Sequence, residues 1–98
     1  MSTFTEHLQG SKPVVVDFHA TWCGPCKAMK PILEEFKHLV GDRATVLKVD
    51  VDRNPNAART YNVQGVPTIV ILHNGIIVWR RSGVVPAKEL MQALEPYW

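Results

Sequence analysis

The feature that most constrains this chain is a pair of cysteines, Cys23 and Cys26, the only two cysteines in its 98 residues. They follow a β-branched run at 14–18, which predicts a strand, and they precede a helical pattern over 23–40. The first turn of a helix has unpaired N–H groups and the positive end of the helix dipole, and both favour a thiolate. We therefore expect Cys23 to be a nucleophile near neutral pH. Cys26, one turn later, can close a disulfide with it, so the spacing predicts a reversible two-electron switch.

Two less reactive interpretations of the pair are weaker. A purely structural disulfide across so short a loop would restrict the unfolded chain little. A structural zinc site needs four ligands, but the sequence has no second cysteine pair and its four histidines show no ligand spacing. We therefore expect a redox dithiol and no metal.

Length and composition limit the class of protein. A chain of 98 residues with 46% hydrophobic residues fits one compact domain over 1–98. The formal net charge of +2 is too small to indicate nucleic-acid binding or attachment to an acidic membrane. No apolar run approaches the ~20 residues that span a bilayer. The first eight residues lack the basic and then apolar pattern of a secretory signal, so we expect a cytoplasmic protein.

Two charged residues stand inside predicted strands. Asp17 interrupts the apolar run at 14–18; if that strand is buried on both faces, burial raises the carboxyl pKa and makes Asp17 a candidate proton acceptor near pH 7. The alternative is an ordinary surface carboxylate. Lys48 lies in a predicted strand over 45–51, where the simplest interpretation is an edge lysine with its ammonium in water.

The helical pattern over 23–40 predicts one apolar stripe that packs inward, formed by Met29, Ile32, Leu33, Phe36, Leu39 and Val40. The remaining patterns complete an α/β order. We predict a helix at 3–9, a helix at 55–61 that Asn54 caps, a hairpin of strands 68–72 and 76–80 around Asn74-Gly75, and a helix at 86–94. A right-handed crossover makes the first two strands parallel, and the hairpin adds two antiparallel ones. The sequence therefore predicts a mixed four-stranded sheet flanked by helices on both faces.

The motif around the cysteines, Val-Asp-Phe-x-Ala-x-Trp-Cys-Gly-Pro-Cys-Lys at 16–27, closely resembles the thioredoxin family. The likeness covers nearly the whole chain from about Ser11, and its further matches are the segments 48–52, 63–68 and 74–75 and the residue Gly83. It implies a thioredoxin fold that lacks the usual first strand. It also implies a general protein-disulfide reductase, a thiol–disulfide oxidoreductase.

The resemblance assigns roles to individual residues. It implies that Cys23 attacks a target disulfide, that Cys26 resolves the mixed disulfide, and that Asp17 is a buried acid beneath the pair. It places Lys48 next to Asp17, where a cation would lower the pKa of the acid, and it makes the Val66–Pro67 bond cis. An apolar rim that receives the target would comprise Trp22, Gly24, Pro25, Val66, Pro67, Gly83 and Val84.

The same resemblance implies the partners. They are target proteins that contain disulfides and a thioredoxin reductase that restores the dithiol. No metal or organic cofactor is implied, because the dithiol itself carries the electrons. We expect a monomer.

Two other functions remain as alternatives. A disulfide oxidase or isomerase typically has His between its cysteines, and Gly24-Pro25 argues against it. A non-enzymatic adaptor would have no need for an acid under the sulfurs. One position departs from the family pattern: His19 stands where thioredoxins usually have an aromatic residue such as Trp. It is either an exposed ring of similar size or an imidazolium that favours the Cys23 thiolate.

Overall fold

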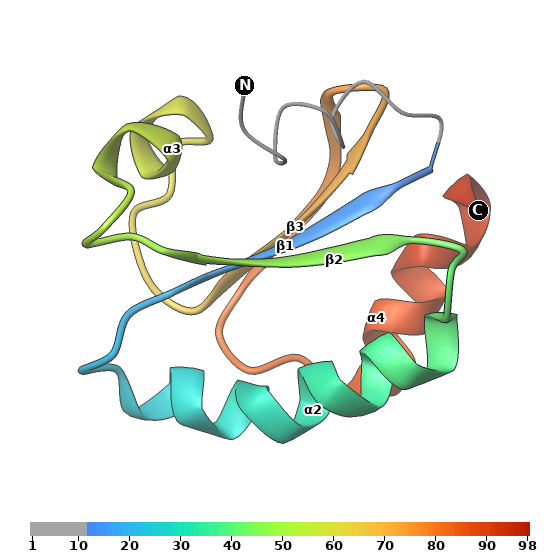
Figure 1. Ribbon diagram of the computed structural model, residues 1–98, viewed down its shortest axis with the longest axis horizontal. Helices are drawn as coiled ribbons and strands as arrows, with labels where there is room; N and C mark the ends of the chain where they lie inside the picture. Colours follow the sequence, from blue (N-terminus) through green and yellow to red (C-terminus); the bar gives the residue numbers. More distant parts are fainter. Residues whose placement is uncertain (1–11) are drawn as a thin grey trace.

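The computed structural model describes residues 12–98, and its centre is a four-stranded mixed sheet. The strands are β1 (Val14–His19), β2 (Thr45–Asp50), β3 (Thr68–His73) and β4 (Ile76–Ser82), in the order β2-β1-β3-β4 (Figure 1). Strand β1 pairs parallel to β2 and antiparallel to β3, and β3 pairs antiparallel to β4. This confirms the predicted mixed sheet. The helix predicted at 3–9 lies outside the described residues.

Helices cover both faces of the sheet. Helices α2 (Gly24–Val40) and α4 (Ala87–Leu94) lie on one face and α3 (Pro55–Thr60) on the other, as Figure 1 shows. A short 3₁₀ helix, η1 (Glu95–Tyr97), follows α4. Among the described residues, no helix has both the length and the apolar character that a membrane crossing needs.

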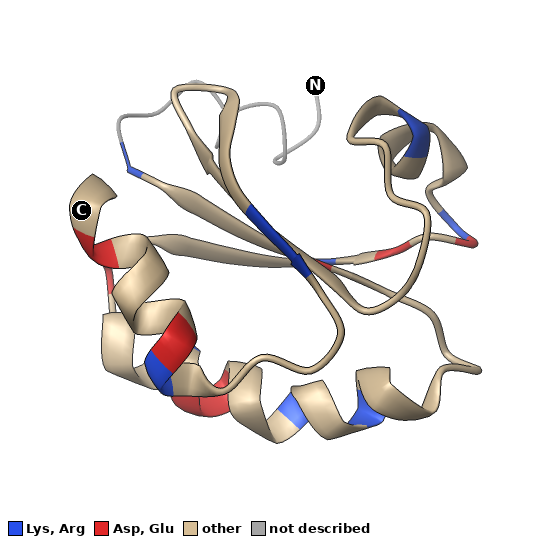
Figure 2. Ribbon diagram, turned by 180° about the vertical axis from the view of Figure 1, so that it is seen from behind, with Lys and Arg blue, Asp and Glu red and all other residues tan. Residues whose placement is uncertain are grey.

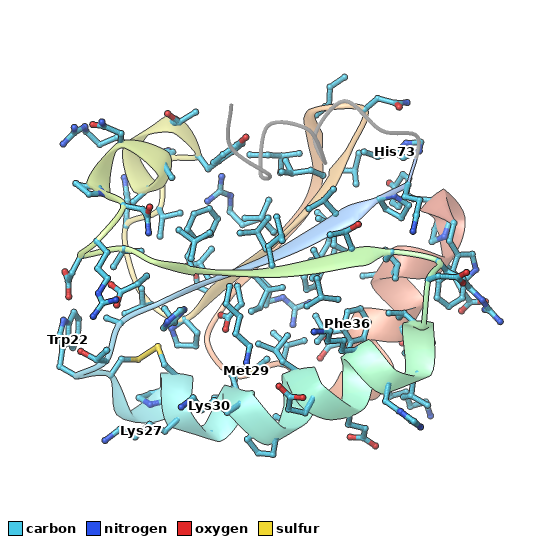
Figure 3. The ribbon with its side chains drawn as sticks, in the orientation of Figure 1. Trp22, Lys27, Met29, Lys30, Phe36 and His73 are labelled. Carbon is cyan, nitrogen blue, oxygen red and sulfur yellow. A yellow bond between two sulfur atoms is a disulfide. The ribbon has the colours of Figure 1, made fainter. Side chains whose placement is uncertain are left out.

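The central strand β1 is buried on both faces, which explains its continuous apolar run. Val15 packs with the α2 and α4 side chains, including Met29 and Phe36, which point from α2 towards the sheet (Figure 3). Val16 and its neighbours on the other face pack under α3. Because side chains alternate along a strand, Asp17 lies on the same face as Val15, towards α2.

Helix α2 agrees with the predicted span, but one residue of its predicted apolar stripe faces solvent. The buried positions are Met29, Leu33, Phe36 and Val40, whereas Leu39 is 50% exposed. At 100° per residue, Leu39 lies roughly 90° from the centre of that stripe. The prediction that Leu39 packs inward was therefore wrong.

The hairpin has the predicted tight turn. Asn74 and Gly75 have φ values of 54° and 78°, the positive values of a primed two-residue turn. Strand β4 continues to Ser82, two residues beyond the prediction, and it carries a bulge: Ile71 pairs with Trp79 whereas Leu72 pairs with Ile77. The extra residue in β4 shifts the register at this point.

Candidate active site

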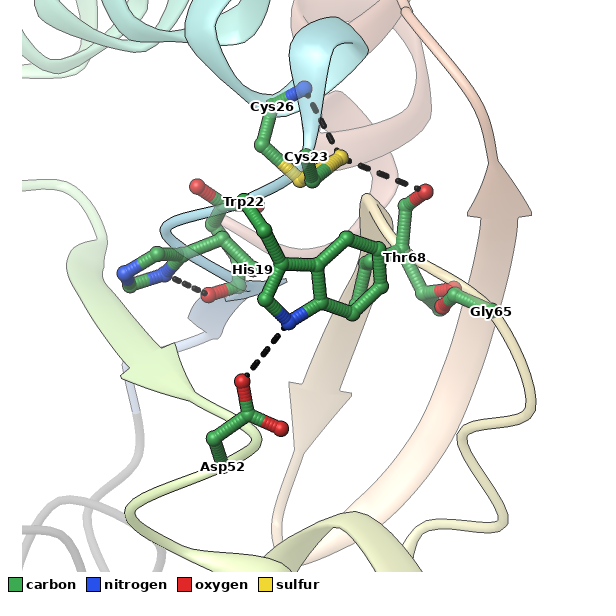
Figure 4. The surroundings of a disulfide bond; sticks show 9 residues. His19, Trp22, Cys23, Cys26, Asp52, Gly65 and Thr68 are labelled. Carbon is green, nitrogen blue, oxygen red and sulfur yellow. Dashed lines mark hydrogen bonds between the residues drawn. A yellow bond between two sulfur atoms is a disulfide. The ribbon is translucent and has the colours of Figure 1, made fainter.

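The two cysteines form a disulfide at the junction between the sheet and α2. Cys23 is the N-cap of α2 and Cys26 lies in its first turn, with 5.3 Å between their Cα atoms. The backbone N–H of Cys26 donates a hydrogen bond to Sγ of Cys23 over 3.1 Å (Figure 4). The exposed fractions of the two residues are only 4% and 6%. A donor directed at Sγ of Cys23 also stabilises a thiolate at that atom, since hydrogen bonds to ionised acceptors are the stronger ones.

The loop before β3 lies directly across from the disulfide. The Val66–Pro67 peptide bond is cis, as the family resemblance implied. Sγ of Cys23 lies 3.6 Å from the carbonyl oxygen of Val66 (Figure 4). The hydroxyl of the buried Thr68 donates a hydrogen bond to the carbonyl oxygen of Gly65 over 2.7 Å and so stabilises the turn of this loop. Sequence reasoning missed this role of Thr68.

The predicted rim residues differ in their exposure to solvent. Trp22 is 69% exposed and Val84 is 48% exposed, whereas Pro67 is buried. Gly24 and Pro25, between the cysteines, are exposed, and Val66 is half-buried. Trp22 and Val66 also line a cavity of about 150 Å³ beside the disulfide. An apolar surface next to a reactive sulfur is a suitable place for a target segment to bind.

Gly83 connects the end of β4 to the cis-proline loop. Its N–H donates to the carbonyl oxygen of Pro67 over 2.9 Å. A Cβ atom at this position would have no neighbour within 4 Å, so crowding inside the protein does not explain the glycine. Its φ of 95° does, because that backbone conformation favours glycine. The expected place of Gly83 in the rim that receives the target stays a prediction.

The exposed indole of Trp22 is held by a residue that sequence reasoning missed. Its Nε1–H donates to Oδ2 of Asp52 over 2.8 Å (Figure 4). Asp52 follows β2 in a turn that Asp50 stabilises, because Oδ1 of Asp50 accepts from the Asp52 N–H over 2.8 Å. An aspartate at a strand end favours such a turn, because its side chain can accept a hydrogen bond from the backbone N–H two residues further on. Nothing in the sequence indicates that it binds Trp22.

Asp17 is buried in the central strand and lines a cavity that Cys26 also lines. It is 4% exposed, and its Oδ1 has no hydrogen-bond partner among the described residues. Burial raises its pKa from 3.8 to about 6, and the charges of His19 and Lys48 oppose that rise. Asp17 and Cys26 line one cavity of about 170 Å³. A buried carboxyl group with a raised pKa therefore lines the same cavity as Cys26, and Cys23 is not among the residues that line it.

Lys48 shares this cavity but has another ionic partner. It lies opposite Asp17 in the β1–β2 register. Its ammonium, however, lies 3.3 Å from a carboxylate oxygen of Glu34 on α2, and the Lys48 side chain is 41% exposed. The prediction for Lys48 was a close pairing with Asp17; the structure gives it a place in the same cavity and an ion pair with Glu34. No role was predicted for Glu34.

The surroundings of the cavity are basic. Lys27 and Lys30, on the exposed side of the first half of α2, also line it, and acidic positions follow only further along that helix (Figures 2 and 3). Within residues 12–98, no three His, Cys, Asp or Glu side chains gather in positions that could hold a metal ion. The chemistry available to this site is the exchange of one disulfide for another. A carboxyl group lines the same cavity as one of the two cysteines.

The sequence of the chain is similar to a known protein family and to several named proteins. The family model described as Thioredoxin matches residues 1–96. A thioredoxin Y of rice, named as chloroplastic, is 44% identical over 95 residues, which cover 96% of this chain and 56% of the rice protein. A thioredoxin-like protein of Synechocystis is 44% identical over 97 residues, which cover 98% of this chain and 92% of that protein.

The fold also matches a solved structure over almost the full chain. A mutant thioredoxin from Halobacterium salinarum superposes with a TM-score of 0.88 at 33% sequence identity. The match covers 99% of this chain and 84% of that chain.

Proposed function

This chain belongs to the thioredoxin family and is a thiol–disulfide oxidoreductase, and on that premise we propose how its residues reduce the disulfides of other proteins. The observation that carries the proposal is the asymmetry of the pair. Cys23 Sγ accepts the N–H of the helix turn and lies 3.6 Å from the carbonyl oxygen of Val66, a rim residue, whereas Cys26 lines the same cavity as Asp17. One sulfur is therefore suited to attack a target and the other to resolve the product.

In the first step, the thiolate of Cys23 attacks one sulfur of a target disulfide. A bond forms between Cys23 Sγ and that sulfur, the target S–S bond breaks, and the other target sulfur leaves as a thiolate. The rim residues position the target. Trp22, Gly24 and Pro25 would provide one side of the binding surface, and Val66, Pro67, Gly83 and Val84 the other.

In the second step, Cys26 resolves the mixed disulfide. Its thiol transfers a proton to the carboxylate of Asp17, and the resulting thiolate attacks Sγ of Cys23. The Cys23–Cys26 bond forms, the bond to the target breaks, and the electron pair leaves with the target sulfur. The target is reduced by two electrons and the pair is oxidised by two. Lys48 would act on this step through its charge at the cavity.

The oxidised pair must then be returned to the dithiol by a donor of two electrons. We propose a thioredoxin reductase for that step and disulfide-containing proteins as targets. The dithiol serves as the electron carrier, so the cycle needs no metal or organic cofactor in this chain. We place the protein in the cytoplasm, because a dithiol reductant works in a reducing compartment. We propose that it acts as a monomer.

Reduction of insulin by dithiothreitol, followed as turbidity, tests this function. We expect the protein to accelerate the reaction and the Cys23→Ser variant to give the rate of dithiothreitol alone. The Cys26→Ala variant is the matched control for a single lost sulfur; it keeps the attacking thiol and should lose turnover. If the unaltered protein gives no acceleration, the fold serves as a binding module and the proposal is wrong.

A further inference from the structure

A charged Asp17 needs a counter-charge in its cavity. The ammonium of Lys48, which was expected to supply it, is paired with Glu34. A buried carboxylate is costly without an opposite charge or hydrogen bonds. Oδ1 of Asp17 has no hydrogen-bond partner among residues 12–98. Lys48 forms an ion pair with Glu34, and the exposed fractions of the two side chains are 41% and 68%, respectively. Solvent weakens the effect of so exposed an ammonium on a buried group.

His19 has the better placement for this role. It follows Asp17 by two residues on β1, so both side chains lie on the same face of the sheet, towards α2. His19 is half-buried, and it is one of the residues that line the cavity together with Asp17 and Cys26. Nδ1 of His19 lies 3.5 Å from the backbone oxygen of Asp17, which keeps the ring next to that residue (Figure 4).

The other elements that pack around Asp17 contribute either no charge or exposed charges. Strand β3 presents Ile69 opposite Asp17 and so contributes no charge there. Helix α2 contributes Lys27 and Lys30, both exposed at the edge of the cavity, and the sulfur of Cys26. Burial raises the pKa of Asp17, and the charge of His19 opposes that rise more strongly than the charge of Lys48 does.

We propose that the imidazolium of His19, rather than the ammonium of Lys48, is the principal cation that keeps Asp17 ionised beneath the redox pair. His19 is then a positioning residue that acts through Asp17, whose own role rests on the function proposed above. An imidazolium loses its charge within the physiological pH range, whereas an ammonium does not. The fraction of Asp17 that is ready to accept the Cys26 proton therefore depends on the charge of His19.

The test is an NMR titration of the Asp17 carboxyl carbon in the oxidised protein, in which neither cysteine titrates. The variants are His19→Phe, a ring without charge, and Lys48→Met, the matched control that removes the other cation. We expect His19→Phe to raise the Asp17 midpoint by roughly half a unit to one unit. A close opposite charge lowers a carboxyl pKa by about 1–3 units, and the effect is smaller here because His19 is only half-buried. Lys48→Met should raise it less.

A third variant, His19→Lys, supplies a charge that does not titrate in this range, and it should return the midpoint to the wild-type value or below it. An unchanged midpoint in His19→Phe, or a larger rise in Lys48→Met, would overturn the inference. If His19→Phe fails to fold, His19→Gln takes its place in the same comparison.

The insulin assay on Asp17→Asn separates this inference from the proposed function. Normal turnover by Asp17→Asn would remove Asp17 from the mechanism whatever the titrations show. Slow turnover by Asp17→Asn together with an unchanged midpoint in His19→Phe would leave the mechanism intact and refute only the role of His19.

Discussion

The backbone N–H of Cys26 donates a hydrogen bond to Sγ of Cys23 over 3.1 Å, so the residue that we propose resolves the mixed disulfide also stabilises the sulfur that we propose attacks the target. The relationship is not symmetrical, because Cys23 is the N-cap of α2 and Cys26 lies inside the first turn. A thiolate on Cys23 gains both this hydrogen bond and the positive end of the helix dipole. Substitution of the Cys26 side chain leaves the N–H in place.

The first prediction follows from that geometry. Cys26→Ser should keep the attack by Cys23 and accumulate a mixed disulfide with the target, whereas Cys23→Ser should form none. Mass spectrometry of the adducts after incubation with an oxidised target protein measures this. Equal trapping by the two variants would reverse or remove the assignment of roles.

The second prediction concerns the pH dependence of stability that Asp17 causes. Its pKa is about 6 in the folded protein, against 3.8 for the ordinary carboxyl group. The folded state therefore binds more protons than the unfolded state between these values, and this contribution to stability falls as the pH rises from about 4 to about 6. Above pH 6 the full cost applies, about 3 kcal/mol for a shift of this size.

Asp17→Asn removes this cost. The variant should be more stable than the wild type by roughly 2–3 kcal/mol at pH 7.5, and the advantage should largely vanish near pH 3.5, where both side chains are uncharged. Denaturant midpoints of the two oxidised proteins at both pH values measure it. An advantage that is equal at the two pH values would mean that packing, not the charge of Asp17, separates the variants.

Much of this architecture follows from local patterns in the sequence. The cysteine pair, the apolar run on β1 and Asn74-Gly75 each have one strongly preferred structure, so the redox junction, the central strand and the hairpin could be predicted. The cis bond at Pro67 was available only from the family resemblance, since most X–Pro bonds are trans.

The details that the sequence did not reveal are side-chain pairings between distant elements. Whether Lys48 turns to Asp17 or to Glu34 depends on how far α2 lies from β2, and no local pattern encodes that distance. The same holds for Trp22 and Asp52, which are 30 residues apart. Leu39 was misplaced for a different reason: an apolar residue at the margin of a helical stripe can face the core or the solvent.

The third prediction tests what the contact between Trp22 and Asp52 does. A single hydrogen bond contributes about 0.5–1.5 kcal/mol, so Asp52→Ala should raise the KM for a protein disulfide roughly 2- to 10-fold by releasing the indole. Steady-state kinetics with a protein target measure this. Asp52→Asn is the matched control, because its side-chain oxygen can still accept from Nε1–H and should keep KM near the wild-type value. Equal effects of the two variants would show that the charge of Asp52, and not the hydrogen bond, is what matters.

The fourth prediction separates backbone conformation from space at Gly83. A Cβ atom would meet nothing within 4 Å at Gly83 or at Gly65, but only Gly83 has a positive φ, of 95°. Gly83→Ala should therefore destabilise the protein by about 1–2 kcal/mol, the typical strain of an L-residue in that region. Gly65→Ala should be neutral or slightly stabilising, because it reduces the freedom of the unfolded chain. Urea denaturation of the two variants measures both effects. Equal stability would show that the strand end relaxes to a negative φ, and the hydrogen bond from Gly83 to Pro67 would then be the contact to re-examine.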